Sequence, residues 1–149
     1  QLATLGPKNP DTLVSMNNLA SFYSKRGQHE KALPLYKDCL ARRRDVLGSE
    51  HPETLDSMHN LAVQYDKQGD VESAAPLHEE CLAKRESVLG KSHRDTLTSK
   101  ESLALSHHSR DDPEKAISLA MECQEEITSK YGKDDRKTLA VNSRLSVIL

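Results

Sequence analysis

Residues 52–62 read Pro-Glu-Thr-Leu-Asp-Ser-Met-His-Asn-Leu-Ala, and this stretch decides the fold because its pattern recurs along the chain. The pair Thr54-Leu55 returns three more times, at steps of 42 residues, as Thr12-Leu13, Thr96-Leu97 and Thr138-Leu139. No gap is needed to keep this register over the 149 residues. A fixed internal period of this length is typical of an array of stacked repeats.

The same 42-residue step relates glycines, small residues and cysteines. The recurring glycines are Gly6, Gly48, Gly90 and Gly132, together with Gly27 and Gly69. The recurring small residues are Ala32, Ala74 and Ala116, and the cysteines are Cys39, Cys81 and Cys123. Because turn-forming and core-type residues recur in one register, each repeat is expected to be the same structural unit.

Each repeat is predicted to form two helices. In the first helix Leu13, Met16 and Leu19 fall on one face at helical spacing. Pro10 suits the first helical position, and Gly27 supplies the left-handed residue that ends the helix. The second helix of the first repeat carries the apolar stripe Ala32, Leu35, Tyr36, Cys39, Leu40, Val46 and Leu47.

Two features are unusual for such repeats. Pro34 and Pro76 fall inside the second helices, where a proline removes one backbone hydrogen bond, and we expect a slight kink rather than a break. In the third repeat Lys100 replaces a methionine, His107 a tyrosine and Asp111 a glycine. The third repeat is therefore expected to be the least stable.

Composition excludes several classes of function. The formal net charge is −2, so the chain has no general positive field that would attract nucleic acid. No apolar run approaches the roughly 18 residues that a membrane-spanning helix needs. Hydrophobic residues make up 36% of the chain, which suits thin stacked layers better than one large core.

No catalytic or metal-binding constellation is predicted. The cysteines recur at one position per repeat and are interpreted as buried core residues. His51 and His93 fall at matching loop positions, as helix-entry residues would, and no set of zinc ligands converges. Gly90-Lys91-Ser92 imitates the end of a phosphate-binding loop, but Arg85 stands where that motif needs glycine.

The repeats resemble a known family. The string Asn17-Asn18-Leu19-Ala20 followed by Tyr23, and its counterpart Asn60-Leu61-Ala62 followed by Tyr65, are similar to the first helix of a tetratricopeptide repeat. The 42-residue version, punctuated by Cys-Leu-x-x-Arg, Leu-Gly and His-Pro-x-Thr-Leu, resembles the cargo-binding repeats of kinesin light chain. The resemblance covers essentially the whole chain.

This resemblance implies an all-α fold, a right-handed α-solenoid of tetratricopeptide-like helix-turn-helix repeats. Residues 1–149 are interpreted as a single fragment of such an array. Its repeats span approximately residues 10–48, 52–90 and 94–132, and a partial repeat spans residues 136–149.

The resemblance also implies where a partner binds, because the first helices of such arrays line a concave groove. Asparagine suits such a groove because its amide offers donors and an acceptor to a peptide backbone. The predicted groove residues are Asn17, Asn18, Ser21, Lys25, His59, Asn60, Lys67, Glu101 and Ser102.

The implied function is a cytoplasmic protein–protein interaction scaffold, not an enzyme, with a peptide or protein partner and with no cofactor, metal, nucleic acid or membrane. Kinesin light chains take acidic peptides with an apolar anchor, and Lys25 and Lys67 would suit such peptides. Asp56, Asp66 and Glu101 oppose them, so the charge preference stays open. An alternative is a regulatory or sensor arm of a larger signalling protein, such as a nucleotide-switched ATPase. Self-association through the ends of the array is a third option.

Overall fold

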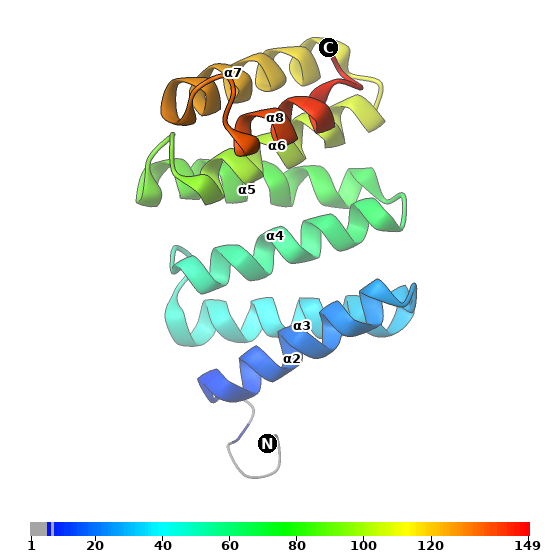
Figure 1. Ribbon diagram of the computed structural model, residues 1–149. Helices are drawn as coiled ribbons and strands as arrows, with labels where there is room; N and C mark the ends of the chain where they lie inside the picture. Colours follow the sequence, from blue (N-terminus) through cyan, green and yellow to red (C-terminus); the bar gives the residue numbers. More distant parts are fainter. Residues whose placement is uncertain (1–5, 7) are drawn as a thin grey trace. The chain divides into compact units, whose positions relative to one another are not determined.

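The computed structural model describes residues 6 and 8–149, and in that part of the chain it contains helices and no strands (Figure 1). The helices are α2 (Pro10–Lys25), α3 (His29–Leu47), α4 (Pro52–Lys67), α5 (Val71–Leu89), α6 (Arg94–Ser109), α7 (Pro113–Tyr131) and α8 (Arg136–Leu145). The chain divides into two compact units, residues 1–77 and 78–149, and the boundary falls inside α5. In the first unit α3 packs on α2 and α4, and in the second α7 packs on α6 and α8. The predicted all-α fold class is confirmed.

The first helix of each pair begins with the same capping hydrogen bond. A side-chain oxygen or ring nitrogen accepts from the backbone N–H two residues later, at 2.8–3.2 Å. The capping residues are Asn9, His51, His93 and Asp135. Each bond satisfies one of the backbone donors left free at a helix start. The predicted position of the two histidines at helix starts is confirmed, and each accepts through Nδ1.

The second helices run through their prolines and stop at glycine. Helix α3 continues past Pro34, and α5 continues past Pro76, so the prediction of no break is confirmed. Gly48 ends α3 with φ 92° and ψ 162°, and Gly132 ends α7 with φ 91° and ψ 157°. This backbone region is open almost only to glycine, which explains why glycine recurs there.

A buried arginine joins the second helix of one pair to the first helix of the next. Arg43 of α3 is 5% exposed and donates through Nη1 to the Glu53 carbonyl at 3.0 Å and to Ser57 Oγ at 2.8 Å. Arg85 repeats this arrangement in the second unit, with bonds of 3.1 and 2.8 Å to the Asp95 carbonyl and to Ser99 Oγ. We call this arrangement the arginine clamp.

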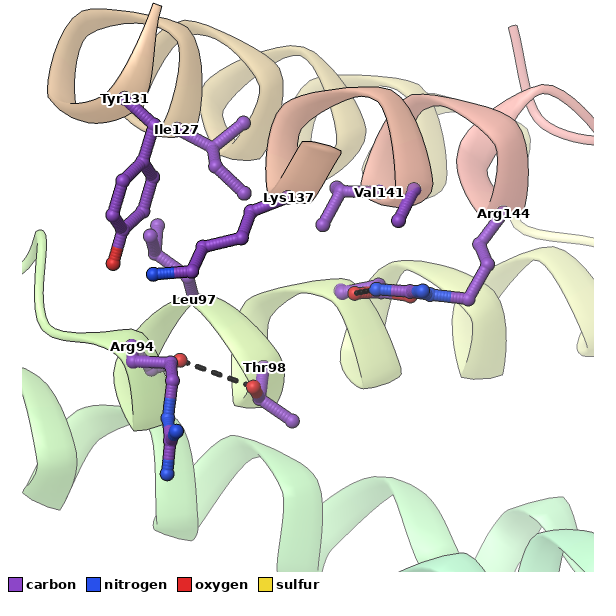
Figure 2. A pocket seen from close by; sticks show the side chains of 10 residues that line it. Arg94, Leu97, Thr98, Ile127, Tyr131, Lys137, Val141 and Arg144 are labelled. Atoms are coloured by element: carbon purple, nitrogen blue, oxygen red, sulfur yellow. Dashed lines mark hydrogen bonds and ion pairs between the residues drawn. The ribbon is translucent and has the colours of Figure 1, made fainter. Parts of the chain in front are cut away.

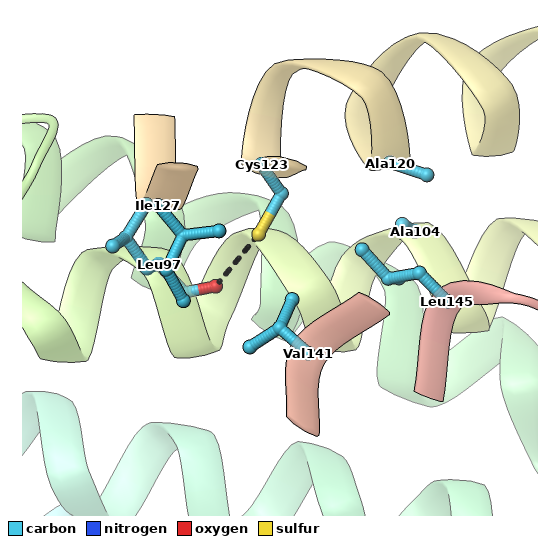
Figure 3. Close-up of a cluster of buried hydrophobic side chains, with 7 residues drawn as sticks. All are labelled: Leu97, Ala104, Ala120, Cys123, Ile127, Val141 and Leu145. Atoms are coloured by element: carbon cyan, nitrogen blue, oxygen red, sulfur yellow. Dashed lines mark hydrogen bonds between the residues drawn. The ribbon is translucent and has the colours of Figure 1, made fainter. Parts of the chain in front are cut away.

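The third repeat replaces the arginine clamp with apolar packing. Ile127 stands at the register of Arg43, and Val141 stands at the register of Ser57. Both are buried in the cluster shown in Figure 3, around the Cys123 thiol, which donates to the Leu97 carbonyl at 3.7 Å. The cluster consists of Leu97, Ala104, Ala120, Cys123, Ile127, Val141 and Leu145.

The predicted apolar stripes were wrong at two positions. Leu19 was expected in the core, but it is 42% exposed, whereas Leu61 at the same register is 5% exposed. Helix α4 packs on α3, which covers this register, whereas no described helix precedes α2. Val46, predicted in the stripe of the second helix, is also exposed, because it lies in the last turn of α3 beyond the clamp.

The three unusual residues of the third repeat each have compensating contacts. Lys100 is buried beside Glu86, Glu122 and Glu126. Burial alone would lower the pKa of Lys100, but the hydrogen bond to Glu126 and the nearby carboxylates outweigh it, and the pKa is raised. Asp111 takes the left-handed conformation with φ 58°, at the register where other repeats have glycine.

His107 lies buried at the corner between α6 and α7. Its Nδ1 lies 3.6 Å from Asp112 Oδ2, and its Nε2 lies 4.0 Å from Glu79 Oε1. Burial lowers the pKa of His107, although the Asp112 and Glu79 carboxylates partly oppose this effect. The folded protein therefore favours the neutral imidazole at this corner.

We expect Leu61→Ala to lower the free energy of unfolding by about 2–5 kcal/mol, because truncating a buried leucine leaves a cavity. Leu19→Ala is the matched control at the same register and should cost less than about 1 kcal/mol, because its side chain is already largely in water. Urea unfolding followed by circular dichroism measures both. Equal losses would contradict the difference in burial between the two leucines.

We also expect a histidine-dependent loss of stability on acidification. The pKa of His107 is lowered on folding, so the unfolded chain binds more protons than the folded chain below about pH 6.5. As the pH falls through this range, the free energy of unfolding decreases by up to about 1.4 kcal/mol per pH unit. His107→Tyr, which restores the residue of the other repeats, should flatten this dependence between pH 7 and 5.5. The exposed neighbour provides the control, His108→Gln, which should leave the slope unchanged. An unchanged slope in His107→Tyr would refute the assignment.

Candidate functional site

In the first unit, two of the predicted groove residues bind each other. Asn60 Nδ2 of α4 donates to Asn17 Oδ1 of α2 at 3.1 Å, and both side chains are half-buried. This pair is separated by 43 residues, one more than the repeat, so it joins neighbouring positions on successive first helices. Asn18, at the register of Asn60, is exposed. The sequence prediction treated Asn18 and Asn60 as equivalent, but their surroundings differ.

The other predicted residues of the first unit differ in exposure. Lys67 Nζ donates to Ser24 Oγ at 3.2 Å, which is a second link separated by 43 residues. Ser21 hydrogen-bonds the buried Tyr36 of α3, whose pKa is raised by burial, so this serine lies partly against its own helix pair. Lys25 is exposed, and His59 is half-buried.

In the second unit, the predicted residue Glu101 forms the strongest polar contact. Arg144 of α8 donates through Nη2 to Glu101 Oε2 at 3.0 Å and through Nε to Oε1, so the pair is bidentate. The Glu101 side chain is 10% exposed, and that of Arg144 is 54% exposed. The hydrogen bond to Glu101 raises the pKa of Arg144. Arg144 and Glu101 are again 43 residues apart. The predicted residue Ser102, which follows Glu101 in the sequence, is half-buried.

A cleft of about 250 Å³ lies around this ion pair, between α6, the end of α7 and α8 (Figure 2). Leu97, Ile127 and Val141 form its apolar floor, and Ala140 also lines it. The complete lining consists of Arg94, Leu97, Thr98, Glu101, Ile127, Tyr131, Lys137, Ala140, Val141 and Arg144. We call this space the α6–α8 cleft.

The rim of the α6–α8 cleft is mainly cationic. Lys137 Nζ lies 4.3 Å from the centre of the Tyr131 ring, a cation–π distance, and Figure 2 shows this side chain reaching from α8 across the opening. The Arg94 side chain is 78% exposed, with Nε 3.8 Å from an Asp95 oxygen, and Figure 2 shows it directed away from Lys137. Because Glu101 is already bound by Arg144, an incoming ligand meets more positive than negative charge at this rim.

The geometry of the cysteines argues against thiol chemistry. Cys39, Cys81 and Cys123 are free and buried. Burial, with a smaller contribution from Glu101, raises the pKa of Cys123 to about 12, so this thiol stays protonated at neutral pH. Across residues 6 and 8–149, no group of three or more histidine, cysteine or acidic residues is placed to hold a metal ion. Within the same residues, no helix combines the length and apolar character needed to cross a bilayer.

Sequence reasoning missed most of the cleft, although a signal was present. The lining residues Ile127, Lys137 and Arg144 each depart from the repeat pattern. Ile127 replaces the arginine of the clamp, and Lys137 stands where the other repeats have aspartate or glutamate. Arg144 stands at the register of Asn18 and Asn60. Such departures mark a surface that differs from the rest of the array.

Comparison with known proteins agrees with this architecture. A family model described as tetratricopeptide repeat matches residues 2–45 and 11–87. Two crystal structures of nearly identical TPR-like repeats, from a Podosopora anserina protein described as a kinesin light chain, are each 30% identical to this chain. Each alignment covers 99% of this chain and 70% of the other, with TM-scores of 0.87 for a substituted form and 0.85.

A more distant structure shares the fold. BtubC (BKLC) from P. vanneervenii is 17% identical, with a TM-score of 0.78 over 94% of this chain and 59% of that one. A comparison with curated proteins gave no match. The family model covers more than half of the chain, and the repeat structures match nearly all of it. The chain therefore belongs to the tetratricopeptide repeat family, with repeats of the kinesin light chain-like kind.

Proposed function

We propose that this chain is a scaffold that holds a peptide or protein partner on the polar faces of its first helices. The tetratricopeptide repeat fold supports an interaction scaffold in general. The observation that carries the specific proposal is the α6–α8 cleft, which combines an apolar floor with a cationic rim. It is smaller than the roughly 300–1,000 Å³ of typical small-molecule pockets, and it suits one anchoring side chain of a longer ligand.

The cleft favours an acidic ligand with an apolar anchor. An aliphatic or aromatic side chain would cover the floor at Leu97 and Val141, where burial of apolar area is favourable. Flanking carboxylates would bind Arg94 and Lys137, and the exposed edge of Arg144 could accept a further carboxylate without releasing Glu101. This proposal agrees in kind with the acidic, anchored peptides that kinesin light chains bind.

The first unit contributes hydrogen-bonding groups. The bond from Asn60 Nδ2 to Asn17 Oδ1 leaves Asn60 Oδ1 and Asn17 Nδ2 as an acceptor and a donor for an extended backbone. We propose contact roles within this unit for Asn17, Asn18, Ser21, Lys25, His59, Asn60 and Lys67, and within the second unit for Glu101 and Ser102. A location in the cytoplasm is also proposed, because the cysteines are free thiols, which are typical of reducing compartments.

The cleft is tested with a labelled acidic peptide that carries one central leucine or aromatic residue. The double variant Arg94→Gln with Lys137→Gln should raise its Kd about tenfold, a loss of roughly 1.4 kcal/mol, and Ala140→Leu should block the floor. The control with the same change in charge is Lys91→Gln with Lys133→Gln, whose side chains are exposed and lie outside the cleft lining. Fluorescence anisotropy gives the affinities. Equal weakening by the control would show nonspecific charge attraction and would reject the cleft.

The asparagines are tested with the natural partner once it has been captured from a lysate with the intact chain. Asn18→Ala with Asn60→Ala should weaken its binding at least about tenfold, because each lost hydrogen bond to a desolvated group costs roughly 1–3 kcal/mol. The melting temperature should change little, since both side chains lie outside the core. Unchanged affinity by calorimetry would exclude these asparagines from the binding surface.

A further inference from the structure

We propose that Lys100 selects the helix that occupies the place of α7 against α6, accepting a helix face with two carboxylates one turn apart and rejecting the faces that α3 and α5 present at the equivalent positions. The Lys100 side chain is 2% exposed and points its ammonium group toward three carboxylates. Nζ lies 2.9 Å from Glu126 and 3.4 Å from Glu122, both on α7, and 3.5 Å from Glu86 on α5.

Compared with the other two repeats at the same 42-residue register, the third repeat has the opposite charge on the second helix beside this lysine. At the register of Glu126 the other second helices carry the cations Arg42 and Lys84. Each of those cations pairs with an acid one turn earlier on its own helix: Arg42 Nε lies 2.8 Å from Asp38, and Lys84 Nζ lies 2.6 Å from Glu80. In the third repeat both helix positions are glutamate, and the cation stands on the first helix instead.

The first-helix position that faces these residues also differs in the third repeat. Met16 and Met58 stand at the register of Lys100, and Met16 lines a small cleft together with Asp38 and Arg42. In the first pair this position therefore faces the same two helix positions that Lys100 faces in the third. A methionine tolerates an acid–base pair that is already neutral, whereas a buried lysine needs uncompensated carboxylates.

Selectivity follows from the cost of an unpaired buried charge. If a helix of the α3 type took the place of α7, Arg42 would occupy the place of Glu126 and Asp38 that of Glu122. The nearly buried Lys100 ammonium would then face one carboxylate of that helix in place of two, with a second cation beside it. Glu86 lies on α5 and would stay beside Lys100 whichever helix took the place of α7, so the preference rests on Glu122 and Glu126. Similar repeats can exchange helices within one chain or between two copies, and this charge reversal opposes such exchange at α6.

A double-mutant cycle measures the coupling in the full chain. Glu126→Lys should lower the melting temperature by roughly 6–12 °C, because it sets two cations together, and Lys100→Met should lower it by roughly 3–6 °C. The double variant restores the pattern Met58, Glu80, Lys84 of the second repeat and should melt within roughly 3 °C of the parent. Lys133→Met serves as the surface control and should be neutral. Additive losses in the double variant would overturn the proposal.

A helix replacement tests selectivity itself. Helices α3 and α7 both have 19 residues, so the α3 sequence can replace residues 113–131 without changing the loop lengths. Lys100→Met should then raise the melting temperature of the chimera although it lowers that of the parent. A shift of the same sign in both proteins would reject a selective role. If neither chimera folds, the double-mutant cycle alone decides, and a coupling indistinguishable from zero rejects the proposal.

Discussion

The arginine clamp is the interaction on which the described arrangement of helix pairs depends. Arg43 and Arg85 each reach from the end of a second helix to a carbonyl in the first turn of the next first helix and to a serine one turn later. In each clamp Nη1 binds two acceptors on the incoming helix, whereas the Arg43 Nε is buried without a hydrogen-bond partner among the described residues. The two Nη1 bonds restrict the depth and the rotation of the incoming helix. Where the clamp is replaced by Ile127 and Val141, these side chains become part of the floor of the α6–α8 cleft. The proposed binding site and the missing clamp therefore share the same two substitutions.

The two units carry different chemistry on equivalent helix faces. In the first unit the link between successive first helices is an amide–amide bond, Asn60 to Asn17, and in the second it is the ion pair of Arg144 with Glu101. The spacing between these linked positions is the same in both units because the backbone repeats, but the side chains at the positions differ. One fold can therefore present a neutral hydrogen-bonding surface in one unit and a charged, anchored surface in the other. Such local variation is how a repeat protein acquires specificity without changing its architecture.

Much of the fold was predictable because the signals are local and repeated. The helix starts at Pro10 and Pro52 and the stops at Gly48 and Gly132 follow from backbone chemistry that the sequence displays directly. The side-chain cap that His51 provides was not predicted, because histidine is not a usual N-cap residue. The burial of a given leucine was not predictable from helical phase alone, because it depends on whether a neighbouring helix covers that register. Leu19 and Leu61 have the same phase and opposite exposure.

The α6–α8 cleft was harder to predict because its parts come from three helices and depart from the repeat pattern. Glu101 of its lining was among the predicted groove residues, but its pairing with Arg144 could not be read from a helical wheel of one repeat. The contacts that join first helices span 43 residues, which a search for the 42-residue period does not reveal. A residue that breaks the pattern is thus more informative about the site than one that obeys it.

The gapless register has a consequence for how such a chain changes in evolution. Because capping residues, clamps and turn glycines all recur at 42 residues, duplication or loss of any 42-residue segment returns most side chains to equivalent neighbours, wherever the breakpoints fall. One exception is a segment that separates Lys100 from Glu122 and Glu126, since these partners lie 22 and 26 residues beyond it. A breakpoint between them would join a buried cation to a helix that carries another cation. Another exception is a segment that separates Ile127 from Val141, which replace the clamp residues together. Recombination is therefore tolerated at most places along this chain and opposed across the turns between α6 and α7 and between α7 and α8.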